Sequence, residues 1–161
     1  MKIKIEEESL EFIRKHNLLE AYQQYITKGY EWTLFFNVSF RTPTSYEIAK
    51  KRFKWFFKYL NTEHELYVPN FVRCWVFYER QDTSNGVHIH ALIDRIDPKY
   101  SEIIQSKARK YFGEISKVEP YDSSRGAAYY LASKINTSRL VAYEFYVINS
   151  KVRNISLHIT T

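Results

Sequence analysis

The stretch VFYERQDTSNGVHIHALI, residues 76–93, predicts the centre of the fold. DTSNG is a turn signal between two runs of β-branched and aromatic residues, so residues 71–81 and 86–96 should pair as an antiparallel hairpin. Side chains alternate between the two faces of a strand, so His88 and His90 point to the same face. The other face receives the apolar residues of that strand, Val87, Ile89, Ala91 and Ile93.

The length of the turn decides which residue faces each histidine. If residues 83–86 form the loop, Glu79 lies across from His90 on the same face of the sheet. A two-residue loop centred on Asn85 and Gly86 would shift the partners by two positions and would keep Glu79 on that face. The hairpin therefore predicts that two imidazoles and one carboxylate converge.

Two histidines and one glutamate make a three-ligand site with room for water or a substrate. Open sites of this kind belong to catalytic metals rather than to closed structural ones. The ligand set does not name the metal, because Zn²⁺ accepts it, while Mn²⁺ and Mg²⁺ suit a site that phosphate oxygens complete. In the alternative interpretation, His88 and His90 lie on a wet strand face and bond to their neighbours. The predicted position of Glu79 favours the metal.

The remaining periodicities place the hairpin in an α+β domain that spans residues 1–161. Further strands are predicted at 31–41 and 114–121, and a last strand hairpin at 141–160. The predicted helices cover residues 6–28, 46–61, 98–112 and 124–136. The core, about residues 31–136, has the order βαββαβ followed by a helix. This order predicts a ferredoxin-like or RRM-like antiparallel sheet with helices on one face and the other face open.

The amino-acid composition indicates the cellular setting and the class of binding partner. Cys74 is the single cysteine, so no internal disulfide forms, and we expect an intracellular setting such as the cytoplasm of a host cell. No run approaches the roughly 20 apolar residues of a membrane span. Lysine and arginine total 24 against 18 acidic residues, and 17% of the residues are aromatic. A basic and aromatic chain favours a nucleic-acid partner.

A second constellation lies in RGAAYYLASKI, residues 125–135. Tyr130 and Lys134 are four positions apart on the predicted helix, so they share a face. A tyrosine can act as a nucleophile, and a lysine one turn away can hold a phosphate or stabilise charge during attack. Adjacent helical residues point about 100° apart, so Tyr129 and Tyr130 cannot both face the metal. We predict Tyr130 as the nucleophile, with Tyr129 as the alternative; a core tyrosine with a surface hydroxyl is the ordinary interpretation of either.

Together, GVHIHALI, a glutamate nine positions before His88 and a downstream helical tyrosine with a lysine resemble the HUH endonucleases. More narrowly, they resemble the single-tyrosine Rep proteins that initiate rolling-circle replication of plasmids and small viruses. The resemblance covers roughly residues 31–136. One departure is that Lys134 follows Tyr130 by four positions, where many Reps have three.

The resemblance implies a metal-dependent, site-specific nick in single-stranded DNA at a replication origin. The tyrosine attacks a phosphate and stays linked to the 5′ end, a 3′ hydroxyl primes synthesis, and a later strand transfer rejoins the DNA. The implied metal ligands are His88, His90 and Glu79, the implied cofactor is a divalent ion (Mn²⁺ or Mg²⁺, with Zn²⁺ open), and host replication machinery is an implied partner.

Contacts to DNA are predicted at three basic residues, Arg41 at the end of the first strand, Lys117 on the fourth strand, and Arg125 before the nucleophile helix, where a helix start attracts phosphate. Other functions stay open beside the Rep-type enzyme. A single-tyrosine transposase or relaxase would use the same chemistry. A non-catalytic RRM-like module would bind a single strand on the open sheet, and a zinc hydrolase would act on a small molecule.

Overall fold

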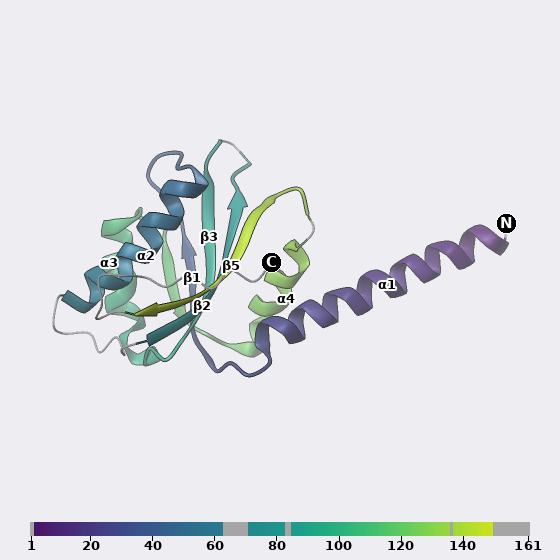
Figure 1. Ribbon diagram of the computed structural model, residues 1–161, viewed down its shortest axis with the longest axis horizontal. Helices are drawn as coiled ribbons and strands as arrows, with labels where there is room; N and C mark the ends of the chain where they lie inside the picture. The colour runs from purple at the N-terminus through teal and green to yellow at the C-terminus, as the bar shows by residue number, and fades with distance from the viewer. Residues whose placement is uncertain (1, 63–70, 83–84, 136, 150–161) are drawn as a thin grey trace.

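The computed structural model shows an α+β fold built on a five-stranded antiparallel sheet (Figure 1). The structure describes residues 2–62, 71–82, 85–135 and 137–149. The strands lie in the order β4-β1-β3-β2-β5, and every neighbouring pair is antiparallel. Their bounds are β1 Trp32–Val38, β2 Phe71–Arg80, β3 Val87–Asp94, β4 Lys117–Pro120 and β5 Leu140–Asn149.

The helices fall where periodicity predicts them. They are α1 Lys2–Thr27, α2 Tyr46–Thr62, α3 Ser101–Tyr111 and α4 Ala127–Lys134. Short 3-10 turns, η1 Pro98–Tyr100 and η2 Ser123–Arg125, occupy the starts predicted for the last two helices. Of the predicted C-terminal hairpin, the first strand is β5, and residues 150–161 lie outside the described residues. None of the described helices is long and apolar enough to cross a membrane.

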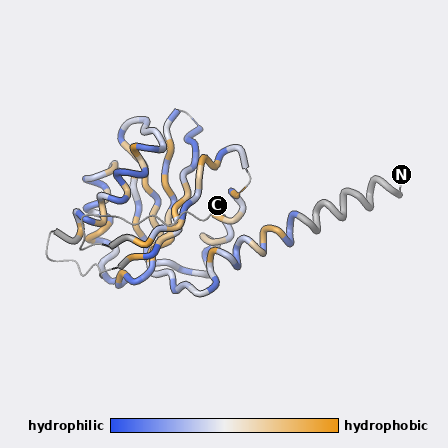
Figure 2. Tube along the Cα trace, viewed as in Figure 1, coloured by the Kyte–Doolittle hydropathy of each residue, from blue (hydrophilic) through white to orange (hydrophobic). Residues whose placement is uncertain are grey.

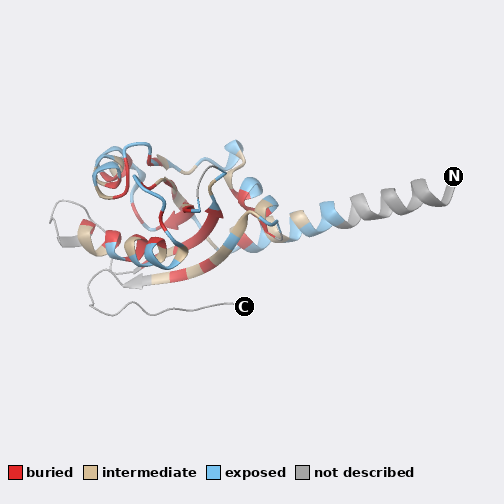
Figure 3. Ribbon diagram, turned by 90° about the horizontal axis from the view of Figure 1, so that it is seen from above, coloured by how far each residue is buried: buried red, intermediate tan, exposed pale blue. Residues whose placement is uncertain are grey.

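One face of the sheet carries the main core, and the strand alternation around the two histidines predicts it correctly. Val87, Ile89, Ala91 and Ile93 are buried there against α2 and α3. Helices α2 and α3 mix hydrophilic and hydrophobic positions (Figure 2), and their buried positions turn toward the sheet (Figure 3). Four fully buried residues of α2 supply much of this layer: Phe53, Phe56, Phe57 and Leu60.

Helices also cover part of the second face, so the prediction of helices on one face only is wrong, while the part beside Phe35, Asn37 and His90 borders a cavity. α4 and the end of α1 pack on this face and form a second buried cluster with the sheet. Trp75, Phe77 and Leu92 project there from β2 and β3 and are at most 3% exposed. Leaving such side chains in water would cost about 25 cal/mol for each Å² of apolar surface, so a helix covers them. The helix contributes Ala128, Leu131 and Ala132.

The β2–β3 hairpin has a longer connection than either predicted turn. Arg80 pairs with Val87, and Gln81 N donates to Gly86 O at 3.0 Å, so residues 81–86 join the strands. Glu79 therefore faces His88, and the prediction that it faces His90 is wrong. The register differs from the prediction by an even number of positions, so Glu79 stays on the predicted face.

A part-buried polar contact joins α2 to β5, the strand that pairs with β2. The Tyr46 hydroxyl donates to Glu144 Oε1 at 2.7 Å, and Lys50 Nζ lies 2.8 Å from the same oxygen. Glu144 is 8% exposed. Burial, followed by the hydrogen bond to Glu144, raises the pKa of Tyr46 from 10.0 to about 12.

This raised pKa predicts a specific loss of stability in alkali. The folded state keeps the Tyr46 proton at pH values where the unfolded chain loses it, so the contribution is complete below about pH 10 and disappears as the pH rises through about 12. We expect the free energy of unfolding to fall more steeply over this range in the wild type than in Tyr46→Phe. Urea unfolding at several pH values measures it, with Tyr129→Phe, an exposed tyrosine, as the control. Parallel curves for the wild type and Tyr46→Phe would contradict the prediction.

Candidate functional site

The structure brings the three predicted metal ligands together. Glu79 and His88 are direct cross-strand partners, and His90 lies two residues further along β3 on the same face. Glu79 Oε2 lies 3.3 Å from His90 Nε2 and 3.5 Å from His88 Nε2. One ligand atom from each residue lies within 4.8 Å of the others. We call these three residues the Glu–His cluster.

The cluster fits a divalent metal ion. Two ligand atoms that each lie about 2.1 Å from one ion are about 3.0–3.4 Å apart in octahedral or tetrahedral geometry, which is close to the contacts at Glu79 Oε2. His90 is 6% exposed, and neither of its ring nitrogens has a hydrogen-bond partner among the residues that the structure describes. Buried polar atoms without a partner are costly, and a metal ion would supply one. The group could therefore hold a metal ion, whose identity the ligand set leaves open.

The charge states of the cluster also suit a metal. The approach of His90, reinforced by Lys134, lowers the pKa of Glu79 from 4.5 to about 2, although burial acts in the other direction. The His90 contact at 3.3 Å is a close polar approach and not a directed hydrogen bond. Burial lowers the pKa of His88. An ionised carboxylate and a neutral imidazole are the forms that bind metals.

Two cations face the other oxygen of the same carboxylate. Lys134 Nζ lies 3.2 Å and Arg139 Nε lies 3.5 Å from Glu79 Oε1. Arg139 is a site residue that no motif or periodicity in the sequence indicates. Two features of the β2–β5 pairing bring Arg139 to the cluster. The register shifts between Tyr78 and Glu79. In addition, Arg80 N donates to Arg139 O. Such a bulge has no clear sequence signal here, so the register shift could be found only in the structure.

α4 turns Tyr130 toward the Glu–His cluster. The helix follows Gly126, whose φ of 74° is left-handed and suits glycine. The Tyr130 hydroxyl donates to Glu79 Oε2 at 3.4 Å, and its ring meets His90 edge to face with centroids 5.5 Å apart. At 41% exposed, Tyr130 is also open to an incoming ligand. Tyr130 is thus partly accessible, and its hydroxyl lies next to the Glu79 oxygen that the two histidines approach.

Helical spacing correctly predicts which neighbours share the side of α4 that carries Tyr130: Lys134 shares it, and Tyr129 does not. Tyr129 lies on another side of α4, where it lines a hollow with Thr27 and Tyr30. Lys134 shares the side of Tyr130, with its Nζ 4.7 Å from the ring centroid. The ion pair with Glu79 raises the pKa of Lys134 in spite of the opposing effect of burial. Lys134 is therefore bound to the carboxylate in this structure.

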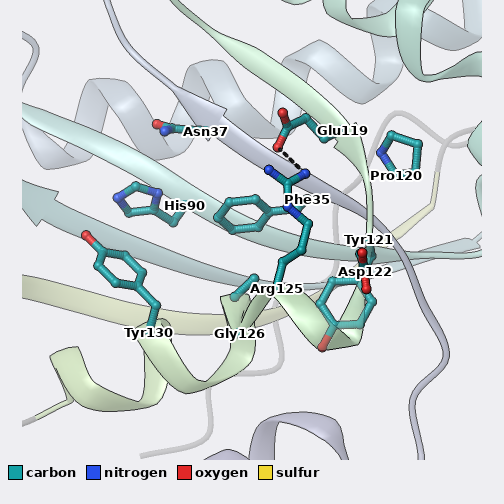
Figure 4. A pocket seen from close by; sticks show the side chains of 11 residues that line it. Phe35, Asn37, His90, Glu119, Pro120, Tyr121, Asp122, Arg125, Gly126 and Tyr130 are labelled. Carbon is teal, nitrogen blue, oxygen red and sulfur yellow. Dashed lines mark ion pairs between the residues drawn. The ribbon is translucent and has the colours of Figure 1, made fainter.

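A cavity of about 360 Å³ adjoins the cluster (Figure 4). His90 and Tyr130 lie at one end, and Phe35 of β1 contributes an aromatic wall. At the other end Arg125 reaches from η2, just before α4, toward Glu119 of β4, with Nη1 3.7 Å from Oε2. The cavity therefore connects the candidate metal centre to a charged rim.

The three predicted DNA contacts do not all lie at this site. Lys117 pairs with Asn37, which in turn pairs with His90, so Lys117 is exposed on the site's face of the sheet. Arg125 lines the cavity. Arg41 is placed elsewhere, because β1 ends at Val38 and the guanidinium then donates to the Lys110 carbonyl of α3 at 3.2 Å. The structure thus does not group Arg41 with the other two.

Comparisons of the chain with protein-family models, with curated proteins and with solved structures found no significant match. Any functional inference therefore depends on the geometry of the site.

Proposed function

We propose that this protein is a metal-dependent, site-specific endonuclease that nicks and rejoins single-stranded DNA through a 5′-phosphotyrosine. One observation carries the proposal. Glu79 Oε2 is 3.4 Å from the Tyr130 hydroxyl and also 3.3 and 3.5 Å from the two histidine Nε2 atoms. A phosphate held at the Glu–His cluster would therefore lie beside a solvent-accessible phenol, which is the proximity that an attack on phosphorus requires.

The proposed step is a transesterification that needs no external energy source. The Tyr130 oxygen forms a bond to phosphorus while the bond from phosphorus to O3′ breaks. The phenol gives its proton to water, and O3′ takes up a proton to become a free 3′ hydroxyl. A divalent ion bound by Glu79, His88 and His90 would neutralise charge on the non-bridging oxygens. Attack by another 3′ hydroxyl on the phosphotyrosine reverses the step and joins the strands.

The wider identity belongs to the same proposal. We infer a single-tyrosine HUH endonuclease of the Rep type, which starts rolling-circle replication of a plasmid or virus with host replication proteins as partners. A ferredoxin-like core is part of this inference, and the antiparallel order β4-β1-β3-β2 with α2 and α3 on one face supports it. A non-catalytic RRM-like module is less well supported, because α4 covers part of the face that such a module would present to a strand.

Metal binding is the first prediction of this function. We expect one Mn²⁺ per chain in the wild type and at least about tenfold weaker binding in His88→Ala/His90→Ala, because two of three ligands are lost. Isothermal titration calorimetry measures the affinity, and thermal unfolding checks that the variant is folded. His16→Ala, which removes an exposed histidine of α1, is the control. Unchanged Mn²⁺ affinity in a folded double variant would exclude the Glu–His cluster as the metal site.

The identity of the nucleophile gives the second prediction. Tyr130→Phe removes the hydroxyl beside Glu79 and keeps the ring, so we expect it to abolish the covalent protein–DNA product. Tyr129→Phe makes the same chemical change on another side of α4 and should keep most of the product. Pooled single-stranded oligonucleotides with Mn²⁺, followed by a denaturing gel, measure both. An active Tyr130→Phe with an inactive Tyr129→Phe would reverse the assignment.

The third prediction concerns the form of DNA that binds. Tyr130 and His90 line a cavity between α4 and the sheet, so we expect a single strand to bind more tightly than a duplex of the same sequence. Lys117→Ala should reduce the slope of log affinity against log salt by about 1 if the lysine contacts a phosphate. Lys51→Ala, exposed on α2 across the sheet, should leave the slope unchanged. Fluorescence anisotropy over a salt series measures these values, and equal affinity for duplex would count against the proposal.

A further inference from the structure

The cavity beside the Glu–His cluster is larger than a phosphate group requires. Its volume of about 360 Å³ is near the lower end of ligand pockets, which run to about 300–1,000 Å³. It extends from His90 and Tyr130 to Glu119 and Arg125 (Figure 4). A phosphate at the cluster would fill only one end, so the remaining space suits a group attached to that phosphate.

The walls of this space suit a flat aromatic ligand. Phe35 of β1 is half-buried, so part of its ring is accessible in the cavity. Its plane lies within 4° of the His90 ring, with centroids 6.2 Å apart. Tyr121 adds a second aromatic side chain to the lining. Nucleobases stack on such rings with little regard to sequence, so these walls alone would accept any base.

The rim supplies the groups that can distinguish one base from another. Arg125 and Glu119 are 65% and 40% exposed, and their closest atoms are 3.7 Å apart. An exposed ion pair at this distance is weak, so both side chains can turn to a ligand with little loss. A guanidinium offers two parallel donors, and a carboxylate offers two parallel acceptors.

Guanine is the base whose edge offers partners to both side chains at once, two donors for the carboxylate and two acceptors for the guanidinium. Its N1–H and N2–H groups can donate to a carboxylate, and the neighbouring O6 and N7 atoms can accept from a guanidinium. These four positions follow one another along the edge of the ring. Adenine, cytosine and thymine each lack either the paired donors or the adjacent paired acceptors.

We propose that the cavity binds a guanine of the substrate strand, next to the phosphate at the Glu–His cluster. Phe35 stacks on the base, Glu119 accepts from N1–H and N2–H, and Arg125 donates to O6 and N7. The inference rests on the proposed nicking function and deepens it, because it names a base that sets where the strand is cut.

Binding of single nucleotides tests the cavity without any cleavage. The four deoxynucleoside 5′-monophosphates are titrated into the metal-free protein, and chemical shifts of the backbone amides give the affinities. We expect dGMP to bind about tenfold more tightly than the other three, as a bidentate contact supplies. Equal affinity for all four nucleotides would overturn the inference.

Three variants assign the effect to the named residues. Glu119→Gln replaces one acceptor by a donor and should remove the preference for dGMP. Phe35→Leu should weaken all four nucleotides by a similar factor, because stacking does not select the base. Glu114→Gln makes the same change at an exposed glutamate outside the cavity and should leave the preference intact. A preference that survives Glu119→Gln would show that this rim does not select the base.

A second experiment separates the cavity from the proposed reaction. Oligonucleotides with a randomised stretch are incubated with the wild-type protein and Mn²⁺, and the covalently attached strands are sequenced. We expect guanine to be enriched at one position beside the cut. Adducts without such enrichment would overturn the guanine site and leave the nicking function standing. Selective dGMP binding without any adduct would overturn the nicking function and leave the guanine site standing.

Discussion

The pairing of β2 with β3 is the constraint on which the site depends. It places Glu79 directly across from His88, and the pleat then puts His90 on the same face. The opposite face of the same two strands is filled by the core against α2 and α3. A register shift of one residue would exchange the two faces, so hydrophobic burial and the Glu–His cluster select the same register. The interaction that stabilises the sheet therefore also assembles the candidate metal ligands.

A second burial requirement brings Tyr130, the proposed nucleophile, to those candidate ligands. Trp75 and Phe77 project from β2 on the site's side of the sheet, and α4 covers them with its apolar side. α4 packs on the sheet through Ala128, Leu131 and Ala132, and the neighbouring side of the helix brings the Tyr130 hydroxyl to 3.4 Å from Glu79 Oε2. Packing thus fixes the direction in which the phenol points, and the Lys134–Glu79 ion pair links the helix to the strand at the cluster.

The sequence predicts the parts of this arrangement that depend on parity and helical spacing. Glu79 and the two histidines share a face for any turn that changes by an even number of residues, so the ligand set survives an error in turn length. The separation of Tyr129 from Tyr130 follows from helical geometry in the same way. Strand alternation does not predict that α4 covers part of the second face, because aromatic residues at alternate positions of β2 serve either an open stacking surface or a second core. Arg139 and Arg41 depend on a bulge and on a strand end, which periodicity does not locate.

The two carboxylate oxygens of Glu79 face two different sets of side chains. Oε2 faces His88, His90 and Tyr130, whereas Oε1 faces Lys134 and Arg139. Arg139 is also paired with Asp82, so the charged side chains around Oε1 and Oε2 cancel when the histidines are neutral. A divalent ion at the cluster would add two positive charges to this balanced set. Attraction for a phosphate would then arise chiefly with the metal, so the same charge balance would couple substrate binding to metal binding.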